Sequence, residues 1–466
     1  MHVSGPAREC AFAALLLGML MSQLDGNVVV AALPVIGTEL AAPAAVAGVT
    51  AAYLLTVTVS TPVHGRLGDL IGRRAVFAGS MLAFAVGSVL CAVAPSMAGL
   101  VAARAVQGIG GSGLVVSAVT ALGEMFDHGE RLRRQVWVTA VFAVSALAGP
   151  PVGAVLAAGP GWRWAFLVNL PLCAVGLVLG VRGLPGRPLT AGPRGFDVAG
   201  TVLVVLGGTA VVLLGSVGGP ATGPLLVVAV AAGLLFVRVQ RRAAVPLVPP
   251  KLLAERGMAG TILVTGLSGV ALFGGFTFVP LAVTAGTGLA PATAGALLVA
   301  LTAGQVAVGL VFAGAARRWS RMVPWGRLGL AMGAAGYAVL AALPVLPAGP
   351  GPAVAGMALV GAAVGLCLQA YTLLGQALAP ADAFGAAMAT LTFARQLGGS
   401  LGAAGLGWLV LAVGERTGPG VAPAAAAAVL VVALLLAPGR GDEPLATASP
   451  RAPATPPRRT LRRPPR

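Results

Sequence analysis

Charged residues are scarce in this chain of 466 residues, of which 9% are charged and 58% are apolar. Ordinary soluble domains contain about 25% charged residues, so this composition cannot cover a water-exposed surface. Long uncharged runs separate the charges. Runs of about 18 or more apolar residues predict helices that cross the roughly 30 Å hydrocarbon core of a bilayer. The sequence therefore predicts an all-α membrane protein.

Cysteine, histidine and lysine are also few. The four cysteines form no CxxC spacing and the three histidines are dispersed, which predicts neither a disulfide framework nor a metal site. The single lysine, Lys251, lies outside any Walker A loop, which excludes a pump with its own ATPase site but not a separate ATPase partner. "GIGGSG" from Gly108 fits a dinucleotide-binding spacing, but it follows no strand and lies inside an apolar run. We therefore expect no cofactor, no metal and no enzymatic activity.

Fourteen apolar runs qualify as membrane-spanning helices. A signal peptide over residues 1–31 is an alternative for the first run, but the length of the run and the presence of Asp25 argue against cleavage. The predicted spans are 11–36, 46–63, 75–94, 97–123, 136–158, 162–183, 196–216, 222–240, 258–283, 291–315, 325–346, 351–377, 383–413 and 419–437.

The predicted spans divide into two blocks of six, 11–183 and 258–437, with two inserted helices in 196–240. Gly65 and Gly314 introduce basic loops at similar distances from the start of each block. Matching offsets favour an internal repeat, which is the plan of transporters that bind cargo between two halves; chance spacing among 68 glycines is the alternative. Residues 1–10 are a predicted cytoplasmic N-terminus, and 438–466, rich in proline and arginine, are a predicted disordered basic cytoplasmic tail.

The net charge of +17 suggests nucleic-acid binding until the basic residues are located. They concentrate at the N-terminus, in alternate connections and after residue 437. This asymmetry is the positive-inside pattern, which predicts a multi-pass protein of the cytoplasmic (inner) membrane with both termini in the cytoplasm. The bilayer is therefore an expected partner and nucleic acid is not.

The connection after the second predicted span reads "GRLGDLIGRR". Its glycines permit a tight turn, Asp69 is suited to cap the start of the third helix, and the arginines hold the loop at the cytoplasmic face. The stretch closely resembles the loop motif of the major facilitator superfamily, in which it braces the cytoplasmic side as a gate. The residues of this predicted gate loop are Gly65, Arg66, Gly68, Asp69, Gly72, Arg73 and Arg74.

Further stretches resemble the branch of drug:proton antiporters with fourteen spans, the EmrB/QacA-like multidrug efflux transporters. They are "LDGNVVVAALPVI" from Leu24, "RAVQGIGGSG" from Arg104, "SALAGPPVGA" from Ser145, "WRWAFLVNLP" from Trp162, "FDVAG" from Phe196 and "ARQLGGSLG" from Ala394. The resemblance covers about residues 11–437. It implies the major facilitator fold, two six-helix bundles plus two inserted helices, and export of small molecules in exchange for protons.

The stretch from Ser145 is a candidate antiporter hinge. Ser145, Gly149 and Gly153 recur every four residues and form a smooth helix face, and Pro150 adds a weak point in the backbone. Mere close packing of helices is the alternative. Ser145 and Ala154 stand where the branch usually has glycine.

Asp25 is the only acidic residue well inside a predicted span. A charge at that depth costs about 2.5–3.5 kcal/mol or more, so it requires a partner or a function. Arg104 lies at a compatible depth. Burial favours the protonated acid and a nearby arginine favours the carboxylate, so a change in their separation would bind or release a proton. A permanent structural ion pair is the alternative.

Polar residues at membrane depth are the candidates for the lining of a cargo cavity: Asn27, Gln107, Gln305, Gln369 and Arg395. We expect proton-coupled efflux of drug-like or antibiotic molecules, with small-molecule cargo and protons as partners. One endogenous metabolite as the cargo, or a non-transporting membrane scaffold or sensor, are the alternatives. The sequence does not decide the oligomeric state, for which a monomer is one alternative.

Overall fold

The computed structural model is all-helical, and no strand occurs in the part of the chain that it describes. Apart from the groups at their two ends, helices pair backbone N–H and C=O groups within their own segment, as a hydrocarbon environment requires. The described residues are 5–42, 46–126, 128–186, 197–214, 222–244, 246–289, 297–316, 319, 321–346, 349–380, 383–413 and 418–439.

The first block forms an N-terminal bundle. Its helices are α1 (Gly5–Glu39), α2 (Val46–Ile71), α3 (Arg73–Ala92), α4 (Met97–Met125), α5 (His128–Ala158), α6 (Trp164–Leu167) and α7 (Asn169–Gly183). The inserted helices are α8 (Val198–Leu214) and α9 (Thr222–Gln240).

The second block forms a C-terminal bundle, in which one helix is interrupted by a π-helical and a 3₁₀ turn. Its elements are α10 (Pro250–Ala254), α11 (Arg256–Ser268), η3 (Gly269–Gly274), η4 (Gly275–Phe278), α12 (Val279–Thr287), α14 (Leu298–Ala315), α15 (Met322–Ala342), η5 (Leu343–Val345), α16 (Gly351–Leu378), α17 (Phe384–Val413) and α18 (Gly418–Leu436).

Glycines allow the helices of each bundle to approach closely. A β-carbon at Gly87 of α3 would lie 2.5 Å from the Cα of Gln107 on α4, and one at Gly361 of α16 would overlap the carbonyl oxygen of Leu301 on α14. In lipid the hydrophobic effect does not hold helices together. Small residues at such crossings allow close van der Waals packing, which stabilises the contact instead. Each bundle also has its own apolar core.

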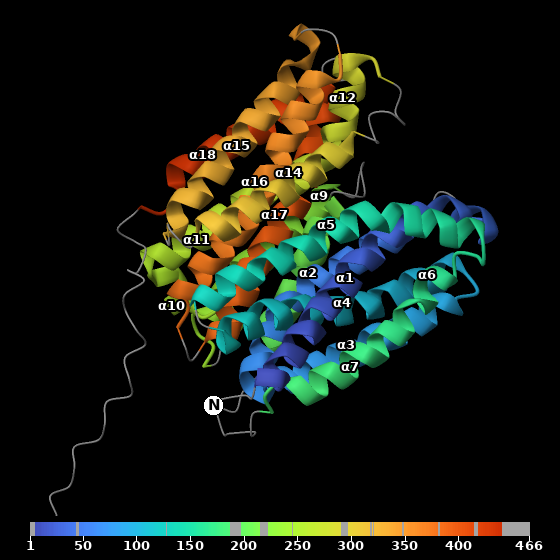
Figure 1. Ribbon diagram of the computed structural model, residues 1–466, viewed down its shortest axis with the longest axis vertical. Helices are drawn as coiled ribbons and strands as arrows, with labels where there is room; N and C mark the ends of the chain where they lie inside the picture. The colour runs from blue at the N-terminus through green and yellow to red at the C-terminus, as the bar shows by residue number, and fades with distance from the viewer. Residues whose placement is uncertain are drawn as a thin grey trace, which may run out of the picture.

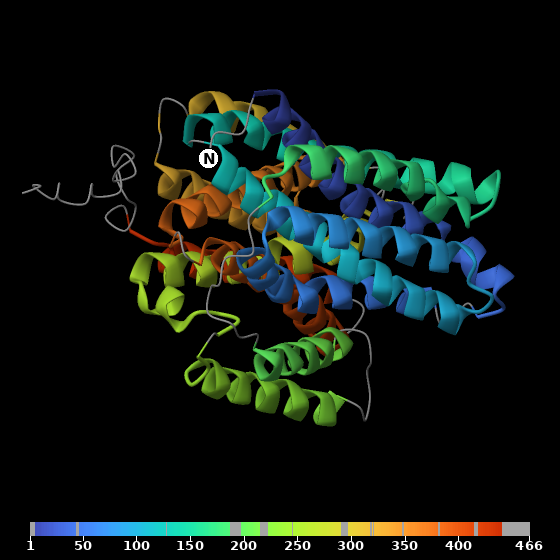
Figure 2. The same ribbon diagram turned by 90° about the horizontal axis from the view of Figure 1, so that it is seen from below.

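The two bundles meet at one end and diverge toward the other. In Figure 1 the C-terminal bundle, in yellow to red, extends upward, and the N-terminal bundle, in blue to green, extends to the right. The main contacts between them are α2 with α17 and α5 with α14. The hairpin of α8 and α9 lies outside both bundles at the lower edge of Figure 2, where α8 packs against α2 and α17.

Nine helices among the described residues are long and apolar enough to cross a membrane, and three shorter apolar helices accompany them. α2 and α17 are not among these twelve. The predicted count of fourteen spans therefore stays a prediction. The predicted tail lies outside the described residues, apart from Pro438 and Gly439.

Several predicted helix ends need correction. α2 continues to Ile71, so that most of the predicted loop after residue 63 is helical. α5 begins at His128 rather than at residue 136. Charged side chains near a helix end do not stop the helix, because they extend to the polar interface or pair with each other.

Candidate transport site

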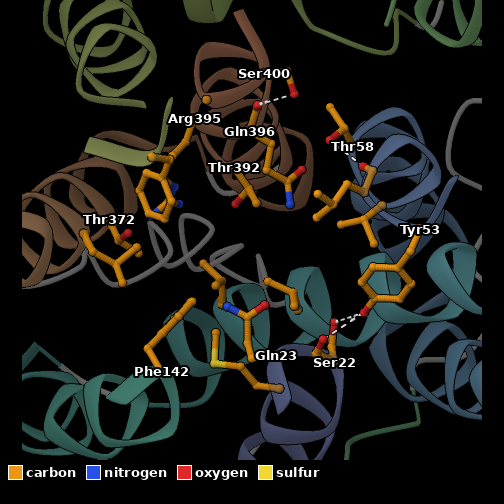
Figure 3. A pocket seen from close by; sticks show the side chains of 18 of the residues that line it. Ser22, Gln23, Tyr53, Thr58, Phe142, Thr372, Thr392, Arg395, Gln396 and Ser400 are labelled. Carbon is orange, nitrogen blue, oxygen red and sulfur yellow. Dashed lines mark hydrogen bonds between the residues drawn. The ribbon is translucent and has the colours of Figure 1, made fainter. Parts of the chain in front are cut away.

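A cavity of about 640 Å³ lies between the two bundles. This volume falls within the range of about 300–1,000 Å³ that is typical of small-molecule sites. Figure 3 shows its polar side chains converging from α1 and α2 on one side and from α16 and α17 on the other. The polar side chains of the wall are Ser22, Gln23, Thr50, Tyr53, Thr58, Gln135, Thr372, Gln376, Thr392, Arg395, Gln396 and Ser400.

Among the described residues of this wall, Arg395 is the only charged one. On α17 Arg395 lies three residues after Thr392 and four before Gly399, so these positions share one helix face, and Gln396 adjoins Arg395 in the wall. The ion pairs found in the described part of the chain do not include Arg395. The cavity thus combines one cation with amide and hydroxyl groups on a mainly apolar wall.

Asp25 lies in the middle of α1, and its carboxylate is surrounded by donors. Arg104 donates from Nη1 to Oδ2, and Gln107 and Asn169 each donate a side-chain amide to Oδ1 at 2.9 Å. The side chains of Asp25 and Arg104 are completely buried. The pair is therefore an ion pair shielded from both water and the cavity.

Three helices hold this cluster in place around α1. Arg104 and Gln107 are three residues apart on α4, so they share a face, and Arg104 Nη1 donates to Gln107 Oε1 at 2.7 Å. Gln107 Nε2 also donates to Ser88 Oγ on α3 at 2.9 Å. Asn169 is the first residue of α7, directly after the break that separates α6 from α7.

Tyr53 and Ser22 separate the ion pair from the cavity. Both line the cavity, and the Tyr53 ring also lies against Arg104, whose guanidinium carbon is 4.2 Å from the ring centroid. Tyr53 donates its hydroxyl to the Ser22 carbonyl at 2.8 Å, as the dashed lines in Figure 3 indicate.

The candidate hinge packs against the helix that carries Asp25. A β-carbon at Gly149 would overlap Asn27, and one at Gly153 would overlap the carbonyl oxygen of Val28. Ser145 is buried and donates back to Val141 O at 2.7 Å. Pro150 and Pro151 lie inside α5, which runs through them without ending. The predicted smooth face thus contacts α1.

The predicted gate loop connects the two bundles. Asp69 accepts hydrogen bonds from the backbone N–H groups of Gly385 and Ala386 at 3.0 and 2.9 Å, at the start of α17. Arg73 pairs with Asp69 at 2.5 Å and with Glu124 at 2.7 Å. The carboxylate therefore sits at the positive end of the α17 dipole.

The predicted role of Asp69 as the cap of the third helix is wrong. Asp69 belongs to the last turn of α2, and Gly72, which precedes α3 with φ of 93°, provides no side-chain cap. Only glycine adopts that φ readily, so a single residue reverses the chain.

The remaining residues of the predicted gate loop differ in their surroundings. Gly68 leaves room for the Arg73 guanidinium. Arg66 has a buried Nε without a hydrogen-bond partner, and Arg74 is exposed.

Further contacts between the bundles lie at the end of the molecule that carries Asp69, here called the Asp69 end. Thr61 donates to Gln396 at 3.0 Å, and Gln376 donates to Val119 O at 3.0 Å. The cavity wall reaches Leu33 near the opposite end of α1. The two bundles are therefore joined at the Asp69 end, and the cavity runs from Leu122 and Gln376 near that end to Leu33.

Of the five predicted lining residues, Arg395 lies in the cavity wall. Gln107 belongs to the Asp25 cluster, and Asn27 bonds to Gln23 O. Gln369 donates to Thr139 of the other bundle at 2.7 Å, and the buried Gln305 packs near Gly365. Functional candidates that sequence reasoning missed are Ser22, Gln23, Tyr53, Ser88, Asn169, Thr392 and Gln396.

Comparisons with known proteins agree with this architecture. A family profile described as Major Facilitator Superfamily matches residues 15–403. The multidrug transporter protein MdtP of Bacillus subtilis is 28% identical over 407 residues, which cover 86% of this chain and 75% of that protein. The uncharacterised MFS-type transporter Rv1877 of Mycobacterium tuberculosis is 31% identical over 420 residues, covering 86% of this chain; the chain spans 59% of that relative's length.

Solved structures share the fold at low identity. The human organic anion transporter MFSD10 (TETRAN) superposes with a TM-score of 0.67 at 14% identity and covers 93% of this chain and 100% of its own. The proton:xylose symporter XylE superposes with a TM-score of 0.64 at 15% identity over 92% of this chain and 95% of its own.

Proposed function

The chain belongs to the Major Facilitator Superfamily, and we propose that it exports small drug-like molecules across the cytoplasmic membrane in exchange for protons. It is a transporter, not an enzyme. Multidrug and efflux names among its relatives support the proposed cargo class, and the motifs quoted above support the branch with fourteen spans.

The observation that carries the proton coupling is the burial of Asp25. Among the described acidic residues, Asp25 is the only one that is buried. A carboxylate in such a place stays charged only while its donors remain in position, so loss of the Arg104 contact favours uptake of a proton. Proton binding and the position of α4 against α1 are then linked.

The coupling of this proton to transport runs through two sets of helix contacts. The Gly149 and Gly153 face of α5 packs on α1, and α2 carries both Tyr53, against Arg104, and Asp69, against α17. A shift of α1 or α4 on protonation is therefore transmitted to the Asp69 end. Opening that end and closing the other one constitutes alternating access.

We place the Asp69 end in the cytoplasm, together with both chain termini. The basic residues of alternate connections support this orientation. The structure described above then corresponds to an outward-facing form. One proton that enters through a potential of about 100 mV supplies about 2.3 kcal/mol, enough for a cargo gradient of roughly fiftyfold.

The test is cargo-dependent proton movement in proteoliposomes with an imposed pH gradient. A panel of fluorescent amphiphiles with anionic, neutral and cationic members avoids a prior choice of cargo. Asp25→Asn should abolish uphill export and cargo-dependent proton release, whereas downhill exchange of cargo should persist. Glu39→Gln, the same change at the exposed end of the same helix, is the matched control and should behave as the parent. Undiminished proton movement in Asp25→Asn would contradict the proposal.

A further inference from the structure

The charge of the cavity points to a class of cargo. The residues that the structure describes in this wall include one cation, Arg395, and no carboxylate. Asp25 cannot serve as a counter-charge for cargo, because it does not line the cavity and both of its oxygens are already bonded. Arg104 compensates Asp25, so the local field in the cavity is dominated by Arg395.

We infer that the cavity selects organic anions, namely compact, largely apolar molecules that carry one carboxylate, sulfonate or comparable acidic group. This inference rests on the proposed transport function, whose cargo class it narrows. The acidic group pairs with Arg395, and the apolar body lies against the remaining wall.

The guanidinium of Arg395 is suited to such a group. It presents five N–H donors in a planar fork that matches the two oxygens of a carboxylate, and it cannot lose its charge. Within the described residues none of these donors has an ion-pair partner. Thr392 and Gln396 on the same helix face offer further polar contacts. A cargo with a fixed positive charge would meet Arg395 without any carboxylate to offset the repulsion.

The apolar requirement follows from the rest of the wall. Phe142 and Phe273 contribute aromatic surface, and Val57, Val115 and Leu368 contribute aliphatic surface. A small hydrophilic acid would leave this surface uncovered. The volume of about 640 Å³ has room for a drug-sized molecule.

An anionic cargo also decides how a proton is exchanged for it. Protonation of Asp25 leaves the charge of Arg104 uncompensated, which can only strengthen the binding of an anion. Cargo and proton therefore do not compete electrostatically, and the conformational change itself must enforce their exchange. A monoanion that leaves as one proton enters moves two charges inward per cycle, so export responds strongly to membrane potential.

The test compares three probes with one shape and different charge: anthracene-9-carboxylate, 9-anthracenemethanol and 9-anthracenemethylammonium. Equilibrium binding to the full chain in phosphatidylcholine nanodiscs is followed by probe fluorescence anisotropy. The carboxylate should bind about tenfold to a hundredfold more tightly than the ammonium compound, as expected for one charge-assisted pair. Arg395→Gln should remove this preference and leave binding of the alcohol within about threefold. Arg395→Lys keeps a positive charge but loses the planar fork, so it should keep a smaller preference for the carboxylate.

One control variant locates the effect. Arg163→Gln changes an arginine outside the cavity and should leave all three affinities unchanged. Thermal melting of each variant tests whether it is folded.

The inference is overturned if the parent binds the ammonium probe as tightly as the carboxylate, if no probe binds saturably, or if Arg395→Gln keeps the preference. Loss of carboxylate binding in nanodiscs with phosphatidylglycerol would keep the anion site but overturn its assignment to a soluble cargo. Since binding requires no proton flux, a preference for the anion without coupled proton movement contradicts only the proposed function.

Discussion

Asp25 and Arg104 form a completely buried ion pair whose two partners differ in one chemical respect. An aspartate that loses its partner can take up a proton and become neutral, whereas an arginine remains charged. Arg104 Nη2 already lacks a hydrogen-bond partner in its buried site. If Asp25 is removed, Arg104 remains as a buried charge without a counter-charge. This is less favourable than the opposite case, in which Asp25 remains and takes up a proton.

This asymmetry predicts a specific order of stabilities. Asp25→Asn should lower the stability by about 3–5 kcal/mol, because it leaves a buried charge uncompensated. Arg104→Gln should cost less, because the acid can be neutralised. The double variant should recover most of the loss caused by Asp25→Asn. Thermal denaturation of the detergent-solubilised protein measures all three variants, and additive losses in the double variant would contradict the ion-pair account.

The pairing of Asp25 with Arg104 was predictable because charges within apolar runs are rare and expensive. Asn169 and Ser88 were not predictable, because uncharged polar side chains occur in many membrane helices at little cost. Their roles depend on α3 and α7 lying beside the Asp25 site. Asn169 had one available signal: it lies seven residues after Trp162 in a stretch that resembles a signature of the branch.

At the scale of secondary-structure elements, the contact between α2 and the start of α17 keeps the Asp69 end closed. Asp69 accepts from two amides that have no partner inside their own helix. The same carboxylate is held by Arg73, which Glu124 of α4 positions in turn. The start of α17 is therefore tied to α2 directly, and to α3 and α4 through Arg73 and Glu124.

Asp69→Asn should weaken this closure. The amide keeps one acceptor oxygen but loses the negative charge, which at a helix start is worth about 0.5–2 kcal/mol. Turnover should fall by roughly twofold to thirtyfold, with a smaller change in cargo affinity, and the amides of Gly385 and Ala386 should exchange hydrogen faster. Glu124→Gln removes a charge that acts on Asp69 only through Arg73, and it should have the smaller effect. Unchanged turnover and exchange in Asp69→Asn would reduce Asp69 to a dispensable contact.

Gly65→Ala should open the same end by steric means. The added β-carbon would overlap Ala389 and lie 2.7 Å from Gly385 O, both on the other bundle, and such overpacking costs about 1–3 kcal/mol. Hydrogen exchange at the start of α17 should therefore increase. Gly79→Ala is the control: it gains the same helix propensity in α3, but its added β-carbon meets no atom within 4 Å. Hydrogen exchange at the start of α17 should therefore remain as in the parent. Equal exchange in both variants would show that the close contact is unimportant.

Helix location was predictable along most of this chain because lipid imposes one simple length and hydropathy requirement. The positions at which helices stop near the Asp69 end could not be predicted. α2 stays helical through a charged segment, because the charges there are paired or hydrogen-bonded by residues far away in sequence. Glu124 lies 51 positions from Arg73, and Gly385 lies 316 positions from Asp69. Local patterns contain no information on such pairings.

At the scale of the whole molecule, the hairpin of α8 and α9 is the element whose relation to the membrane matters most. α9 exposes large apolar side chains, including Leu226, Val227 and Leu234 at 54%, 67% and 70%. α9 has 19 residues and is one of the nine candidate spans. Only 6% of its most apolar stretch of 18 residues is buried inside the protein. Such a surface is stable in hydrocarbon and not in water.

Reporter insertions distinguish fourteen spans from twelve. If α8 and α9 both cross the bilayer, alkaline phosphatase inserted in their connection, residues 215–221, should be exported and active. Green fluorescent protein at the C-terminus and in the connection between α4 and α5 should fluoresce, since both sites are then cytoplasmic. Phosphatase inserted at Pro95, between α3 and α4, is the matched positive control, because that connection is external in either count. Although α8 is only 17 residues long, or about 25 Å, a bilayer adapts to such a mismatch at modest cost. An inactive phosphatase at 215–221 beside an active one at Pro95 would place the hairpin on the cytoplasmic surface and leave a protein of twelve spans.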